Sequence, residues 1–361
     1  MADYKKIMLE AFKQKANPTM FLAGMARPKI TKAVDIEIDV VRGRRTHAVA
    51  IKMGTGSRMN DLSQFTTKTY QPVFYDEAYS ITAMELQKRL PGMTVYQAES
   101  SSYAEDLAAL ITDKQSLVQD KEVRAIELQA STAMFDGKIT NLPGGLEVDF
   151  QKKATHDIQP TNKWSASNGV PLTNIQAGCD LCRKDGMVED MVFELVVADD
   201  VIEALLGNAQ FVSKANLRHV TNVNIGMPMQ RAGGVFHGVF SAGPYTIELW
   251  SYPQVYEVPT GFGLSGEGTL KPYIPSAKAL LKPKSGIRFD LVYGGIPQVV
   301  PQVDPILSGF GLNGSLTIVE GDFVPYAYVD WRKQCIEAGV RTNPLFIPHQ
   351  IDGFVTFKVL V

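Results

Sequence analysis

The sequence predicts an α+β fold in which one long helix is combined with many strands. Residues 102–136 contain neither proline nor glycine, and apolar side chains recur there at close to helical spacing. From Ser276 onward the chain instead reads as successive strand-like runs, separated by prolines and glycines. Because no regular alternation of strand and helix typical of parallel sheets is present, an early helix and late strands favour α+β.

The composition is that of a globular protein with a large core. The chain has 361 residues, of which 45% are hydrophobic and 20% charged, a length that suggests two domains. Its formal net charge of −2 creates no overall basic field for nucleic acid or anionic membranes. We find no signal-peptide hydrophobic region and no apolar run of membrane-spanning length. Three cysteines argue against a disulfide framework, so we expect synthesis in a reducing, intracellular compartment.

The long helix has clear start and stop signals. Ser102 and Glu105 form a capping box, and Gly137 is suited to a left-handed C-cap. At 1.5 Å per residue the helix would be roughly 50 Å long. Charged residues between the apolar positions need water or a partner on the opposite face; they are Asp113, Lys114, Asp120, Lys121, Glu122, Arg124 and Glu127. We therefore predict a half-solvated strut.

The first 82 residues predict an arm and a long two-stranded excursion. A short amphipathic helix is expected at residues 4–15, ending at Asn17-Pro18. Alternating apolar and acidic residues at 34–40 predict a half-buried strand, and residues 65–75 predict a second, edge strand. An isolated hairpin is marginally stable in water, so we expect a neighbouring subunit to support this one.

The middle of the chain predicts a compact α/β part. Residues 171–186 form a helix with Ile175, Cys179 and Cys182 on one side, followed by a buried strand at 191–199. Asp199 or Asp200 would cap a second helix. Two strands flank Gly243-Pro244, and six more follow with the sequences KALLK, IRFDLVYG, SLTIVEG, FVPYAYVDW, LFIPHQ and FVTFKVLV.

Two motifs resemble cofactor or metal sites without the surroundings that such sites need. GFGLSG at 261–266 matches a dinucleotide-binding pattern, but prolines on both sides leave no room for the helix that would bind the pyrophosphate. Cys179-x-x-Cys182 lacks a second ligand pair for zinc, and it lies inside a predicted helix rather than at a redox-active helix start. We predict no cofactor and no metal, and two small buried side chains at the cysteines.

No pattern indicates a catalytic site. The chain has no nucleophile elbow and no Walker loop, and its five histidines are scattered singly at positions 47, 156, 219, 237 and 349. The basic run from Arg42 to Arg45 is the one concentration of charge. It is either a solvated hairpin face or a contact for an acidic patch on a neighbour. We predict that the protein is not an enzyme.

The order of these segments resembles the lambda-type major capsid proteins of tailed bacteriophages, which share the Hong Kong 97 capsid fold. FTTKTYQPVFYDEAYSITAMELQKRLPG is similar to the family's second hairpin strand and the entry to its peripheral domain. VRAIELQASTAMFDGKIT resembles the end of its spine helix, and MVFELVVADDVIEALLGN resembles the start of its axial domain. KPYIPSAKALLKPKSGIRFDLVYG and FVTFKVLV resemble its returning strands.

The resemblance implies a domain organisation. It consists of an N-terminal arm (1–33), an extended loop (34–82), a peripheral domain (83–164) with the spine helix (102–136), an axial domain (165–275) and a return to the peripheral domain (276–361). The arm and the extended loop would reach over adjacent subunits.

The resemblance also implies a function and partners. Hexamers and pentamers of the chain would form an icosahedral shell around double-stranded DNA, which it would contact non-specifically. The short arm implies a separate scaffolding protein, besides a portal and possible decoration proteins. The shell would be assembled in the host bacterial cytoplasm and would form the virion capsid, without membrane contact.

Two other classes remain open, and the contact residues are a hypothesis. The chain could be another self-assembling protein, such as a nanocompartment shell or a tail component, or a soluble α+β enzyme with a deep polar pocket. For contacts between subunits we select four basic residues of the extended loop, Arg44, Arg45, Lys52 and Arg58.

Overall fold

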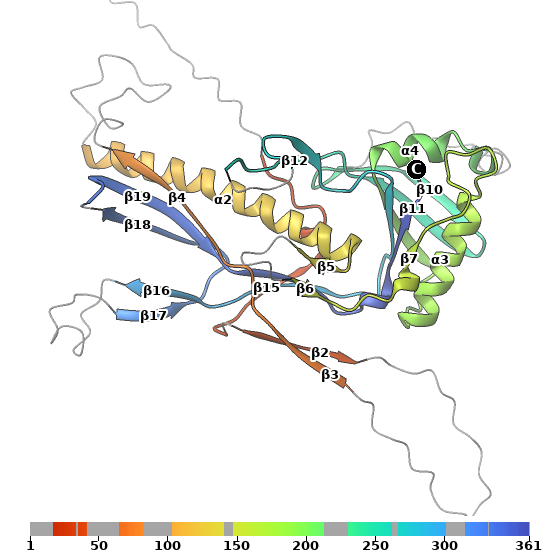
Figure 1. Cartoon of the computed structure of the whole chain (residues 1–361), viewed down its shortest axis with the longest axis horizontal. Helices are drawn as coiled ribbons and strands as arrows, with labels where there is room; N and C mark the ends of the chain where they lie inside the picture. Colours follow the sequence, from red (N-terminus) through yellow and green to blue (C-terminus); the bar gives the residue numbers. More distant parts are fainter. Residues whose placement is uncertain are drawn as a thin grey trace, which may run out of the picture.

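The computed structural model describes residues 17–33, 35–41, 65–82, 103–140, 147–212, 230–261, 266–300, 315–330 and 332–360. The chain forms an elongated body, with a long helix and a small sheet at one end and a larger sheet with two helices at the other (Figure 1). Two ribbons project from this body, so the molecule is far from spherical.

Helix α2 (Tyr103–Phe135) is the predicted long helix. It ends before Gly137, which adopts a left-handed φ of 70° as predicted for a C-cap. The Lys152 ammonium donates to the Phe135 carbonyl (3.3 Å), so a cation lies at the negative end of the helix dipole. Two of the charged residues predicted to need water or a partner, Glu122 and Glu127, are buried. Glu127 accepts from the three backbone amides of residues 21–23, whereas neither oxygen of Glu122 has a hydrogen-bond partner, so the prediction is wrong for Glu122.

Two three-stranded sheets lie along α2. The first has the order β18-β19-β4 and is fully antiparallel; its strands are β18 (Val324–Asp330), β19 (Cys335–Thr342) and β4 (Tyr75–Thr82). The second has the order β1-β15-β20, with strands β1 (Arg27–Ile30), β15 (Phe289–Tyr293) and β20 (Pro344–Pro348). The Gln129 side chain of α2 joins the helix to this region, because it accepts from the Phe346 amide (3.0 Å).

The largest sheet has seven strands in the order β7-β21-β14-β8-β11-β10-β9. They are β7 (Asp157–Ile158), β21 (Val355–Lys358), β14 (Lys278–Pro283), β8 (Val192–Val197), β11 (Tyr245–Ser251), β10 (Gly234–Ala242) and β9 (Gln230–Arg231). Helix α3 (Pro171–Asp185) packs on one face, where Gly178 lets the Phe357 and Leu281 side chains approach its backbone. Helix α4 (Asp199–Leu206) follows β8.

Four short ribbons complete the fold. They are β2 (Ile36–Val41) with β3 (Phe65–Tyr70), β16 (Ile296–Val300) with β17 (Ser315–Val319), β12 (Val255–Glu257) with β13 (Leu270–Pro272), and β5 (Lys138–Ile139) with β6 (Val148–Asp149). The first two project from the body (Figure 1).

One hydrophobic core joins the seven-stranded sheet, α3, α4 and the C-terminal half of α2. A small separate cluster of Ile81, Leu110 and Ala338 lies under the N-terminal half of α2. The long helix therefore belongs to the main core at its C-terminal half and rests on a thin sheet at its N-terminal half.

The structure corrects two details of the sequence prediction. Residues 65–75 do not form one strand, because the chain leaves the hairpin at Tyr70 and re-enters as β4, paired with β19. Pro72, which has no amide hydrogen, lies in this break. The cap of α4 is Ala198 rather than an aspartate; the Asp200 carboxylate instead accepts from the Val201 amide (2.9 Å) and the Ala277 amide (2.8 Å).

Candidate assembly surfaces

The β2–β3 hairpin is the most isolated ordered element of the described chain. Its six residue pairs run from Ile36–Tyr70 to Val41–Phe65, and beyond its base it stands clear of the body (Figure 1). The base is held by Tyr70, whose hydroxyl donates to the Asp149 carbonyl (2.7 Å) and whose ring packs on Phe150 (6.0 Å between centroids). The predicted contact residues Arg44, Arg45, Lys52 and Arg58 lie outside the described residues.

Two other ribbons expose apolar side chains. On the β12–β13 ribbon, Leu270 is 68% exposed and Val255 is nearly half exposed. On the β16–β17 ribbon, Ile318 is nearly half exposed. Single exposed apolar residues are common on protein surfaces, so these positions are candidate contacts only if a neighbour joins them into a larger apolar surface.

The outer face of the β18-β19-β4 sheet carries a rigid aromatic pair. The rings of Tyr326 and Tyr328 stack with centroids 5.8 Å apart, and their hydroxyls donate to Asp76 and Glu337 respectively. The Arg341 guanidinium lies 4.1 Å from the Tyr326 ring centroid and donates to Asp76 (3.0 Å). Tyrosine and arginine held in fixed rotamers lose little entropy on binding and are enriched at protein interfaces.

The opposite face of this sheet contains an unpaired buried carboxylate. Glu122 of α2 is 2% exposed, and neither of its carboxylate oxygens has a hydrogen-bond partner. Burial, with the nearby charges of Glu77 and Asp76, raises the pKa of Glu122 to about 8. Those two neighbours are paired elsewhere, Glu77 with Lys121 (3.1 Å) and Asp76 with Arg341.

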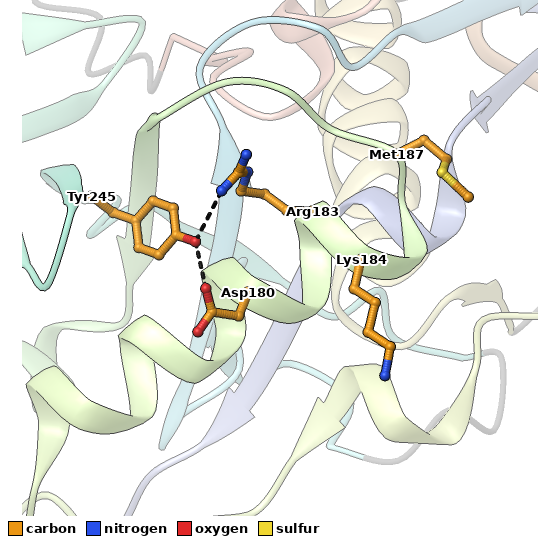
Figure 2. A pocket seen from close by; sticks show the side chains of 5 residues that line it. All are labelled: Asp180, Arg183, Lys184, Met187 and Tyr245. Carbon is orange, nitrogen blue, oxygen red and sulfur yellow. Dashed lines mark hydrogen bonds between the residues drawn. The ribbon is translucent and has the colours of Figure 1, made fainter. Parts of the chain in front are cut away.

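An open depression of about 490 Å³ lies beside α3 (Figure 2). Its wall is made by Asp180, Arg183, Lys184, Met187 and Tyr245. The Tyr245 hydroxyl donates to Asp180 and accepts from Arg183 (3.4 Å), and burial followed by the Asp180 interaction raises the pKa of this phenol. These polar groups hold one another, and the arrangement contains no nucleophile activated by a neighbouring base.

The cysteines and histidines are separate within the described chain. Cys179 and Cys182 are buried and free, and burial raises the pKa of both thiols, as expected for packing residues. Each described histidine has its own hydrogen-bond partners. His156 binds the Phe354 carbonyl and Asp185, His237 binds Ser251, and His349 binds Asp290. Among the described residues, no three or more metal-ligating side chains lie together.

The glycine-rich pattern at 261–266 and the character of the helices complete the description of the sequence features. After Gly261 the chain continues into strand β13, and no helix follows the G-x-G-x-x-G pattern, whose residues 262–265 lie outside the described part. In the parts of the chain that the structure describes, we find no helix with the length and apolar character to cross a membrane.

Comparison with known proteins gives a consistent result. The sequence model of the family described as phage major capsid protein E matches residues 6–359. A solved capsid protein of an E. coli CFT073 prophage superposes with a TM-score of 0.59 at 16% identity, over 95% of this chain and 94% of that one. The capsid of a native GTA particle superposes with a TM-score of 0.50 at 10% identity, over 98% and 94%. No curated protein sequence matches significantly.

Proposed function

The chain belongs to the phage major capsid protein E family, and from this premise we propose that it assembles as hexamers and pentamers into an icosahedral head around double-stranded phage DNA. It is a structural capsid protein of the virion with the Hong Kong 97 fold, as the structural likenesses indicate. The sequence resemblance to this fold is thereby confirmed.

The observation that carries the proposal is the projecting β2–β3 hairpin. A two-stranded ribbon that projects from the body is marginally stable in water on its own. A neighbouring subunit that covers the hairpin would stabilise it, and repetition of this contact closes a shell. Such interfaces bury large areas many times over, so no enzymatic site is needed for the function.

The assignment of residue ranges to domains follows the sequence resemblance. We assign residues 34–82 to the extended loop, 83–164 and 276–361 to the peripheral domain, and 165–275 to the axial domain around the capsomer centre. β4 (Tyr75–Thr82) is shared, because it is the last part of the loop range and pairs with β19 beside α2. Arg44, Arg45, Lys52 and Arg58 remain our candidates for contacts with a neighbouring subunit.

The other partners are part of the proposal. A separate scaffolding protein would guide curvature, a portal would replace one pentamer, and decoration proteins could bind the outer surface. The near-neutral net charge of −2 favours weak, non-specific contact with the packaged DNA. Assembly would take place in the host bacterial cytoplasm.

The test is assembly of the purified full-length protein. Negative-stain electron microscopy and sedimentation at low and high concentration should show rings of capsomer size or closed particles. A stable monomer at every concentration, with all segments resistant to protease, would contradict the proposal and favour an enzyme with an undetected pocket.

Variants of the loop sharpen this test. Deletion of residues 50–64 should abolish large particles while the monomer keeps its melting temperature. Reversal of Arg44 and Arg45 to glutamate should lower the assembly yield, with Lys184→Glu as a charge-reversal control at an exposed lysine of α3. An unchanged yield in the double reversal would remove these two residues from the interface.

A further inference from the structure

The outer face of the β18-β19-β4 sheet contains two similar pairs of a tyrosine and a carboxylate. The Tyr326 hydroxyl donates to Asp76, and the Tyr328 hydroxyl donates to Glu337. The two rings lie nearly parallel, at 14°, with centroids 5.8 Å apart. Tyr326 is directly opposite Gly339, where a Cβ would come within 2.7 Å of the Tyr326 ring, so the glycine leaves room for this arrangement.

The first pair already binds a guanidinium. The Arg341 guanidinium lies 4.1 Å from the Tyr326 ring centroid, and its Nε donates to Asp76 (3.0 Å). Stacking on an aromatic ring and a charge-assisted hydrogen bond to a carboxylate are the two interactions for which a planar guanidinium is suited. A tyrosine and a carboxylate on this face therefore hold an arginine side chain.

The second pair offers the same two groups, but its ring is open. Tyr328 is 48% exposed, and among the described residues no lysine or arginine lies over its ring. Glu337 is bound by the Lys333 ammonium (2.7 Å), which also lies 3.6 Å from Asp330. One ammonium thus serves two carboxylates, beside a ring on which nothing stacks from the outer side.

The strand register places this open ring at the end of a stack. Arg341 pairs with Val324, two residues before Tyr326, and Tyr328 lies two residues after it. Arg341 and Tyr328 are therefore on opposite sides of the Tyr326 ring. The free side of Tyr328 is turned toward Asp330, the next residue of β18 on this face.

We infer that the open side of Tyr328 is a binding site for an arginine side chain of a second copy of the chain, supplied by its basic run from Arg42 to Arg45. The inference rests on the proposed function and names the surface that receives the extended loop. The incoming guanidinium stacks on the ring and donates to Glu337 or Asp330. This repeats the arrangement of Arg341.

The charge distribution favours this occupant. Residues 42–64 contain five basic side chains and one acidic side chain, a net charge of +4 with histidine counted as neutral. Since the whole chain carries −2, the remaining residues carry −6. Three of the five basic side chains are arginines within four consecutive residues, and arginine is the cation that stacks on tyrosine and pairs with carboxylates at the same time.

The basic run of the same subunit does not reach this site. The β2–β3 hairpin points away from β18 and β19 (Figure 1), and Arg42 to Arg45 follow its outermost residue, Val41, with a reach of at most about 14 Å. The base of the hairpin is fixed by Tyr70 and by residues 17–33. The resemblance led us to expect that the whole arm (1–33) reaches over a neighbour, but residues 17–33 pack on their own subunit. A second copy must supply the arginine.

The first test is binding of a synthetic peptide of residues 40–47, VVRGRRTH, to the full-length protein, read from the NMR signals of labelled tyrosine rings. Tyr328→Leu removes the stacking face and should weaken binding by about 5-fold. A peptide with lysine in place of the three arginines should also bind about 5-fold more weakly. Equal binding of both peptides, or no effect of Tyr328→Leu, would overturn the inference.

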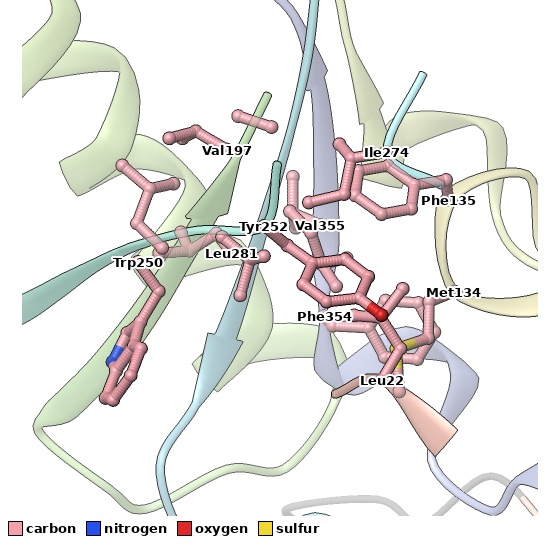
Figure 3. Close-up of a cluster of buried hydrophobic side chains, with 14 of the residues drawn as sticks. Leu22, Met134, Phe135, Val197, Trp250, Tyr252, Ile274, Leu281, Phe354 and Val355 are labelled. Carbon is pink, nitrogen blue, oxygen red and sulfur yellow. The ribbon is translucent and has the colours of Figure 1, made fainter. Parts of the chain in front are cut away.

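Val329→Ala is the matched control for Tyr328→Leu. Val329 is 49% exposed and, by strand alternation, lies on the other face of β18. Neither residue belongs to the main hydrophobic core, part of which Figure 3 shows, so both variants should fold. Val329→Ala should leave peptide binding unchanged, and a loss equal to that of Tyr328→Leu would show that the ring is not the binding surface.

The second test asks whether the loop of one copy reaches this face of another. One copy carries Gly43→Cys, and a second, tagged copy carries Ser80→Cys on β4, directly opposite Glu337; the three native cysteines are buried. Oxidation of the mixture should give a mixed disulfide dimer on a non-reducing gel. The pairing of Gly43→Cys with Lys184→Cys on α3 should give about 10-fold less. Equal yields from the two mixtures would overturn the inference.

Assembly separates this inference from the proposed function. Failure of the unaltered protein to form shells contradicts the proposed function, whereas peptide binding still tests the site on the free subunit. If the unaltered protein assembles, Tyr328→Leu should slow shell formation by about 5-fold, and so should lysine in place of all three arginines of the run. The combined variant should be no slower than either, because both changes remove one contact. Losses that multiply would show two independent contacts and overturn the inference.

Discussion

The two halves of α2 meet different surroundings. In the N-terminal half the helix rests on one thin sheet, and Ala108, Ala109 and Asp113 are exposed. In the C-terminal half almost every side is covered, by residues 17–33, by β20 and by the seven-stranded sheet. Glu122 and Glu127, five residues apart, stand where the two halves join.

These two glutamates show that burial alone does not determine what a carboxylate contributes. Glu122 and Glu127 are 2% and 0% exposed, yet Glu127 accepts three amide hydrogens and Glu122 accepts none. Burial raises the pKa of both, but backbone amides oppose the rise at Glu127, whereas at Glu122 the charges of Glu77 and Asp76 add to it. We conclude that Glu127 stabilises the fold and that Glu122 weakens it.

The largest expected effect comes from replacing Glu127 by alanine, with the same change at Glu122 as the comparison. Glu127→Ala removes three charge-assisted hydrogen bonds and leaves buried amides unpaired, so the free energy of unfolding should fall by about 3 kcal/mol. Glu122→Ala on the same helix should change it by less than about 1 kcal/mol, because lost packing offsets a removed desolvation penalty. Urea denaturation measures both, and equal losses in the two variants would contradict the comparison.

Much of the fold could be predicted from local sequence. The long helix, α3, β8 and the late strands have strong periodicity and clear caps or breakers, so the predicted ranges agree with the structure. β19 was not predicted, because CIEAGVRT mixes polar residues with a glycine. That glycine, Gly339, is needed because the Tyr326 side chain lies against it.

The contacts that residues 17–33 make with the rest of the chain could be predicted only in part. Glu127 is spaced three and seven residues from the buried Ala130 and Met134, and Glu122 is spaced four from Val118 and Ile126, so helical spacing places both glutamates on buried stripes. Their partners could not be found in this way, since Thr19 and Tyr252 are 233 residues apart in the sequence. Contacts between distant segments depend on the complete topology rather than on any local pattern.

A pH-dependent gain in stability is expected from Glu122→Gln. The folded protein holds this carboxyl with a pKa of about 8 against an ordinary 4.5, so it binds more protons when folded than when unfolded. The free-energy cost of burying the ionised Glu122 carboxylate is therefore absent below pH 4.5. It grows as the pH rises and reaches its full value above pH 8. The free energy of unfolding of Glu122→Gln should equal that of the unaltered protein at pH 4 and exceed it by about 2 kcal/mol at pH 9. This gain is smaller than the full pKa shift would give, because water can enter locally around the carboxylate.

Thermal melting from pH 4 to pH 9 checks this prediction, with Asp113→Asn as the exposed control. A gain that is the same at every pH would show that Glu122 is not protonated in the folded protein at neutral pH. A loss at pH 9 would show that a donor binds this carboxylate, and the contrast with Glu127 would disappear.

The smallest expected effect concerns the ion pair next to Glu122. Lys121 and Glu77 are 3.1 Å apart with both side chains about half exposed, so Lys121→Gln should lower the free energy of unfolding by no more than about 0.5 kcal/mol.

The Lys121 ammonium nevertheless compensates the Glu77 charge that raises the pKa of Glu122. Without the Lys121 ammonium the cost of the buried Glu122 charge should grow. Lys121→Gln should therefore lower the free energy of unfolding less in the Glu122→Gln background than in the unaltered protein. A double-mutant cycle at low salt measures this coupling, which should fade at 1 M salt as the charges are screened. A coupling of zero at low salt would mean that Glu122 does not sense its acidic neighbours and that burial alone raises its pKa.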